Sequence, residues 1–245
     1  MSLTDDQIKD YRGLLTEINT LAQDDLLALW RAYSHQDPVS LYEALRQGVP
    51  EIIEMYRAVA ADTATLFYAE TQGVLFSAED LTKATTINRQ QVVANLRWAM
   101  FNPGNTEVLG LIAGIIQKHV VDGSRQFALD GFERAGAGWY RAARENACEF
   151  CRMLATWGAT EWGPYTSADA AVTVGKGATS RRSSAMPKGS TFHKNCMCLP
   201  VRASEYEVPE HVNEWAEQYY AATDAVGNSY DYRAILAHMR QMNKA

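Results

Sequence analysis

The sequence predicts a mainly α-helical protein in three parts: an N-terminal multi-helix domain over residues 1–135, a small α+β module over 136–204, and C-terminal helices over 205–245. Apolar residues recur at helical spacing through residues 1–133. The period changes at Gly136-Ala137-Gly138, and all four cysteines lie beyond it. Because 47% of the 245 residues are hydrophobic, the chain can form a sizeable core.

The N-terminal part opens with a long amphipathic helix, predicted over about residues 4–33. Thr4 and Gln7 have the spacing of a capping box. The apolar positions then follow at helical spacing: Ile8, Tyr11, Leu15, Ile18, Ala22, Leu26, Leu29, Trp30 and Tyr33. Asp37 caps a second helix with Pro38 at its first position. We expect Gly48-Val49-Pro50 to break that helix, and a third to run from about Pro50 to Thr71.

Two further helical regions complete the N-terminal part. Ser77-Ala78-Glu79-Asp80 starts a fourth, which is expected to continue until just before Asn102-Pro103-Gly104. Thr106 caps a fifth, which reaches roughly Glu133. No catalytic constellation is recognisable in these residues, so their apolar pattern is interpreted as helix packing.

The second half alternates short strands with helices. Trp139-Tyr140-Arg141 and Leu199-Pro200-Val201-Arg202 are predicted strands, and Phe150 to Ala155 is a predicted helical turn. The segment 158–190 has the Gly, Ser, Thr and Ala content of a loop. Val208-Pro209-Glu210 opens another helix, and a last one is predicted over about 231–242.

The cysteines form two motifs with the spacing of metal ligands. Cys148 and Cys151 make a C-x-x-C, and His193, Cys196 and Cys198 make an H-x-x-C-x-C. Thiols three residues apart on a turn can face one tetrahedral ion, and alternate residues of an extended segment share a face. These five candidates for four positions predict a structural Zn²⁺ site, about one per chain, with one candidate surplus. A redox pair, disulfides and ordinary buried cysteines remain alternatives.

Composition narrows the class of protein. The net charge of −6 and a pI near 5.4 argue against a general nucleic-acid binder. The acidic start of the sequence, Met1 to Asp6, does not resemble a signal peptide, and no apolar run is long enough to predict a membrane span. We therefore expect synthesis in a reducing cytoplasm, where cysteines bind metal more often than they form disulfides.

One segment is basic, in contrast to the negative net charge of the whole chain. Residues 170–204 contain no acidic side chain, and their basic side chains are Lys176, Arg181, Arg182, Lys188, Lys194 and Arg202. Basic residues in a loop can neutralise phosphates without reading base sequence. Lys176, Arg181, Arg182, Lys188 and Lys194 are thus candidate contacts to nucleic acid or to an acidic partner, and a merely solvated loop is the alternative.

The motifs of the second half, taken together, carry a family resemblance. They are Gly138-Trp139-Tyr140-Arg141, Ala147 to Ala155 with the first cysteine pair, His193 to Cys198, Asn213-Glu214-Trp215, Ala221-Ala222-Thr223 and the final helix around Arg233. In this region, about 138–240, the chain resembles the MuF-like minor head proteins of tailed bacteriophages, most closely the actinobacteriophage type. Met197 departs from the pattern, since relatives often have a basic residue there.

The resemblance implies a minor capsid protein inside the virion head near the portal, made in the host cytoplasm. Its implied partners are the portal protein and/or the major capsid protein, with packaged double-stranded DNA a further candidate and no membrane. Its implied role is head assembly and DNA packaging or exit.

The alternative function is a capsid maturation protease or a zinc-dependent nuclease. The sequence contains no G-x-S-x-G and no H-E-x-x-H motif. Glu149 and Glu161 are the nearest candidate general bases for a catalytic zinc ion. The pattern favours a structural role, assigns no catalytic residue and leaves the question of enzyme activity open.

Overall fold

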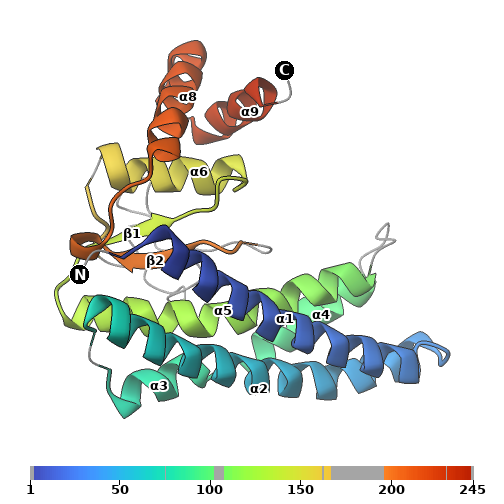
Figure 1. Ribbon diagram of the computed structural model, residues 1–245. Coiled ribbons are helices and arrows are strands. Elements are labelled where there is room, and N and C mark those ends of the chain that lie inside the picture. Colours follow the sequence, from blue (N-terminus) through green and yellow to red (C-terminus); the bar gives the residue numbers. More distant parts are fainter. Residues whose placement is uncertain are drawn as a thin grey trace. The chain divides into compact units, whose positions relative to one another are not determined.

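The computed structural model describes residues 3–74, 76–101, 108–161, 163–166, 196–229 and 231–243. These residues divide into two compact units. The helical unit runs from Asp5 to Phe127, and the cysteine unit comprises residues 3–4 and the described residues from Ala128 onward. The mainly helical fold class predicted from the sequence is confirmed (Figure 1).

The helical unit is built on a long hairpin of α1 (Asp5–Tyr33) and α2 (Pro38–Gln72), which lie side by side (Figure 1). Asp37 caps α2 by accepting hydrogen bonds from the backbone N–H groups of Val39 and Ser40. The two helices pack closely at Gly48, where a Cβ atom would lie only 2.7 Å from Cδ2 of Leu29. A larger residue at position 48 would therefore force the Leu29 side chain to shift.

The predicted break at Gly48-Val49-Pro50 was wrong, because α2 continues through it without interruption. Pro50 removes one backbone hydrogen bond from the helix interior. Val49, Ile52 and Ile53 are nevertheless all buried around it. Burial of this apolar face outweighs the lost hydrogen bond, so tertiary packing keeps the helix continuous despite the helix-breaking tendency of Pro50.

The fourth helical region predicted from the sequence has the expected start and end but consists of two helices, α3 (Ala78–Thr85) and α4 (Arg89–Phe101). Ser77 and Asp80 form a reciprocal capping box at the start of α3. Thr86 then adopts an extended backbone, and the Asn88 side chain accepts a hydrogen bond from the Gln91 N–H at 3.0 Å. The second cap begins a new helix.

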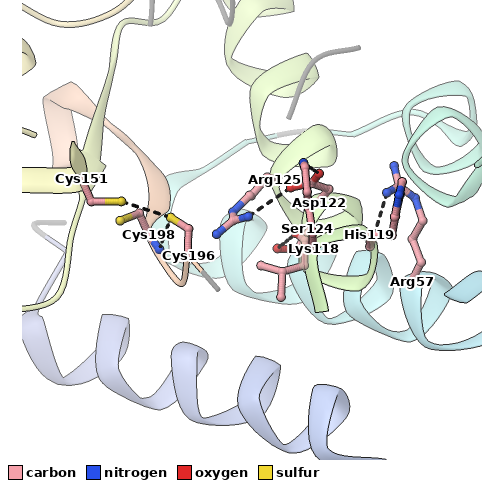
Figure 2. A network of polar contacts seen from close by, with 10 residues as sticks. Arg57, Lys118, His119, Asp122, Ser124, Arg125, Cys151, Cys196 and Cys198 are labelled. Carbon is pink, nitrogen blue, oxygen red and sulfur yellow. Dashed lines mark hydrogen bonds and ion pairs between the residues drawn. The ribbon is translucent and has the colours of Figure 1, made fainter. Parts of the chain in front are cut away.

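A buried polar network joins α5 (Val108–Arg134) to its neighbours in the helical unit (Figure 2). Asp122 accepts hydrogen bonds from Lys118 and, at 3.0 Å, from the fully buried Arg125. Arg57 of α2 donates to the carbonyl oxygens of Ala84 and His119. Burial lowers the pKa of Arg57, and the negative charge of Asp122 opposes that shift.

The cysteine unit surrounds a two-stranded antiparallel sheet. Its elements are β1 (Trp139–Ala142), α6 (Glu149–Thr156), η1 (Trp157–Glu161), β2 (Leu199–Arg202), η2 (Ala203–Glu205), α8 (Glu210–Val226) and α9 (Tyr232–Met242). The strands pair with Trp139 opposite Arg202 and Ala142 opposite Leu199. Both predicted strands and the predicted helices of this half are present, within a few residues of their expected ends.

A small apolar core holds α6 against α8 and α9 (Figure 1). Trp157, 1% exposed, lies at its centre and makes edge-to-face contacts with Tyr219 and Tyr232. Met153 and Leu154 of α6 pack there with Ile235 and Met239 of α9. The helix that carries Cys151 is thus packed against the two C-terminal helices.

No helix in the described parts of the chain combines the length and apolar character needed to cross a membrane.

Candidate metal centre

The antiparallel sheet brings the two cysteine motifs to one place. β1 ends at Ala142 and leads towards Cys148, whereas β2 begins at Leu199, directly after Cys198. Ala142 and Leu199 are opposite each other in the sheet. The end of one strand and the start of the other therefore meet, and the segments that carry the motifs leave from the same edge.

The start of α6 positions the first pair. Cys148 is the N-cap residue, with an extended backbone, and Cys151 is the third residue of the helix. Residues at these positions have neighbouring side chains, as in a capping box. The positive end of the helix dipole also favours the thiolate form of both cysteines, which is the form that binds metal.

Three thiols come together in the folded chain. The Sγ atoms of Cys151, Cys196 and Cys198 all lie within 4.8 Å of one another, and all three residues are buried (Figure 2). Cys151 Sγ lies 3.4 Å from Cys196 Sγ, and the Cys198 N–H donates to Cys196 Sγ at 3.4 Å. Cys148 is exposed and is not one of the three clustered residues, although its side chain interacts with that of Cys151 and raises the pKa of that thiol.

These distances fit a zinc ion. Four sulfur ligands with Zn–S bonds of about 2.3 Å in tetrahedral geometry lie about 3.8 Å from one another. The separation of 3.4 Å between Cys151 and Cys196 and the upper bound of 4.8 Å for all three pairs are compatible with this value, whereas a disulfide requires a bond of about 2.05 Å and all four cysteines are free. The three buried cysteines could therefore bind a metal ion such as zinc.

Without a metal ion, the thiols of Cys151 and Cys198 favour their protonated form. Hydrogen bonds with Cys148, Cys196 and Cys198, together with burial, raise the pKa of Cys151. The hydrogen bond with Cys151 lowers the pKa of Cys198, but Cys196 and burial outweigh it and raise that pKa to about 11. Several thiolates in one buried space repel one another, so a divalent cation is the natural partner for this arrangement.

Arg141 supplies a further positive charge. It lies in β1 and is 2% exposed. Burial lowers the pKa of Arg141, but electrostatic interaction with Cys198, Cys196 and Cys151 raises it above its ordinary value overall. A guanidinium beside three sulfurs favours their charged, metal-binding form. Sequence reasoning missed this residue, although Arg141 shares a strand face with Trp139 and so points inward with it.

His193 and the five candidate contact residues Lys176, Arg181, Arg182, Lys188 and Lys194 lie outside the described residues. Glu149, one candidate base, accepts a hydrogen bond from Asn243 at 3.3 Å and lies 3.9 Å from Arg240. Its carboxylate is therefore engaged with α9 and the residue that follows it.

The fold and the cysteine cluster define a helical protein with a cysteine-rich unit able to hold one metal ion. The model of the VG15 protein family matches residues 2–222, nearly the whole sequence, so the chain belongs to this family. No curated protein and no solved structure is similar enough to match.

Proposed function

We propose that the protein is a MuF-like minor structural protein of a tailed-phage head whose cysteine unit is held together by one zinc ion. The cysteine cluster is the observation that supports a structural metal most directly, because its ligands come from two distant segments. A bound zinc ion supplies bonds that join the start of α6 to the start of β2. The phage assignment rests on the motif resemblance over residues 138–240.

The proposed ligands are Cys151, Cys196 and Cys198, with Cys148 as the fourth and His193 as the surplus candidate. Cys148 is favoured because it lies at the N-cap of α6, next to Cys151 on the helix, and its side chain contributes to the raised pKa of Cys151. Four thiolates close the coordination shell, and a closed shell has no position for a reacting water. The proposed centre is therefore structural, and the protease and nuclease alternatives gain no support from it.

The proposed partners are the portal protein or the major capsid protein, with the protein located inside the head near the portal. The basic residues Lys176, Arg181, Arg182, Lys188 and Lys194 would contact an acidic partner surface or the phosphates of packaged DNA.

Quantitative mass spectrometry of purified virions tests this proposal. We expect the protein in every preparation, in far fewer copies than the major capsid protein, and labelled at the portal vertex by antibody in opened heads. Incubation with major capsid protein is expected to leave both chains intact. Absence from virions would contradict the proposal that this is a structural protein of the phage head. Cleavage of the capsid protein that requires Glu149 would contradict it in favour of an enzyme.

A further inference from the structure

A groove runs along one side of the hairpin formed by α1 and α2. It has a volume of about 600 Å³, and its lining includes Leu14 of α1 with Val59 and Leu66 of α2. Tyr11 and Phe67 also line it, stacked with their ring centroids 4.0 Å apart. Every lining residue belongs to the helical unit, so the groove is a property of this unit alone.

The apolar side chains of the groove are unusually accessible. Leu66 is 65% exposed, Leu14 48% and Val59 45%. Leu14 is seven residues from Leu21, which is 54% exposed, and Val59 is seven residues from Leu66. A spacing of seven places side chains above one another on a helix, so each helix presents an exposed apolar row beside the other. Two adjacent apolar rows with a groove between them form a surface on which a third helix can pack.

The charged residues of the groove all have one sign. Asp10, Asp62 and Glu70 line it together with uncharged side chains, and no lysine or arginine does. All three carboxylates are exposed, and within the described parts of the chain none of them forms an ion pair. A partner with basic side chains beside its apolar ones would therefore complement both the apolar rows and the negative charge of the groove.

We propose that this groove binds an amphipathic helix of a partner protein, with an apolar face flanked by lysine or arginine. The apolar rows would contact that face, and Asp10, Asp62 and Glu70 would pair with the flanking cations. A second copy of this chain fits less well, because a face-to-face pairing of two identical grooves would place these carboxylates against one another.

Two synthetic peptides test the proposal against the full-length protein. Both are amphipathic helices with leucines at heptad spacing, and they differ only in flanking residues, lysine in one and glutamate in the other. Fluorescence anisotropy is expected to show that the lysine peptide binds at least about tenfold more tightly. Its affinity is expected to fall as salt is added, because the paired charges are at the surface.

Matched variants locate the binding site on the protein. Leu66→Ser is expected to weaken binding of the lysine peptide about tenfold or more. Val39→Ser changes a side chain of α2 that is almost equally exposed, at 64%, but lies outside the groove, and should have no effect. Asp62→Lys is expected to weaken binding, whereas Asp224→Lys on α8 makes the same charge change elsewhere and should leave the affinity within about twofold.

Three outcomes would overturn the proposal. The first is equal binding of the lysine and glutamate peptides, and the second is equal effects of Leu66→Ser and Val39→Ser. The third is a concentration-dependent dimer in analytical ultracentrifugation that Leu66→Ser abolishes, because the groove would then be an interface between copies of this chain.

Discussion

Replacing Cys151 with serine is expected to abolish tight zinc binding and to unfold the cysteine unit. Cys151 is the buried member of the first cysteine pair, and its Sγ lies within 4.8 Å of those of Cys196 and Cys198. Structural zinc sites contribute about 10–16 kcal/mol of apparent binding free energy in small zinc-binding peptides. That is as large as the whole stability of a typical domain, about 5–15 kcal/mol. Losing a central ligand therefore removes most of what holds the unit together.

Limited proteolysis and circular dichroism should separate the two units in the Cys151→Ser protein. We expect rapid cleavage beyond the helical unit, while α1 to α4 and α5 up to Phe127 keep their helical signal, since this unit contains none of the cysteines. Zinc affinity and a protease-resistant cysteine unit equal to those of the unaltered protein would contradict the prediction.

Measuring the zinc affinity of two further variants identifies the fourth ligand. Cys148→Ser is expected to weaken zinc binding strongly, whereas His193→Gln should leave it unchanged if the histidine is the surplus candidate. The opposite result would exchange the roles of the two residues and leave the three buried cysteines as ligands.

Replacing Arg141 with leucine is expected to lower zinc affinity about 10–100-fold, the range found when groups that support metal ligands are removed. Four thiolates around Zn²⁺ carry a net charge of −2, and the buried guanidinium offsets part of it. Leucine fills similar space but leaves that charge uncompensated in a buried site. Competition with a zinc chelator of known affinity measures the change.

Controls separate charge from packing at position 141. Arg141→Lys retains the charge and is expected to recover much of the affinity, although it lacks the planar guanidinium. Arg144→Leu removes an exposed arginine two residues beyond β1 and should have no effect. Equal loss in Arg141→Lys and Arg141→Leu would show that shape, and not charge, is what the site requires.

The sequence predicted the cysteine unit better than the helical unit, for a physical reason. Metal ligands must be particular residue types at short spacings, so Cys148-x-x-Cys151 and Cys196-x-Cys198 are visible without a structure. Their strands also matched, because the runs 139–142 and 199–202 are short and clearly bounded. His193 stays a prediction, since it lies outside the described residues.

Tertiary packing and local capping explain the features of the helical unit that the sequence did not predict. Pro50 is a helix breaker by local rules, yet α2 continues because its apolar face is buried against α1. The break between α3 and α4 depends on the cap at Asn88, which the apolar period does not reveal. Helical periodicity identifies the buried face of a helix, whereas the exposed rows of Leu14 and Leu66 emerge only when two helices lie together.

Metal analysis of freshly purified protein, never exposed to a chelator, tests the central claim most directly. The account predicts about one zinc ion per chain and cysteines that react with a thiol reagent only after the zinc is removed. Protein that is folded, free of metal and fully reactive at all four thiols would contradict it.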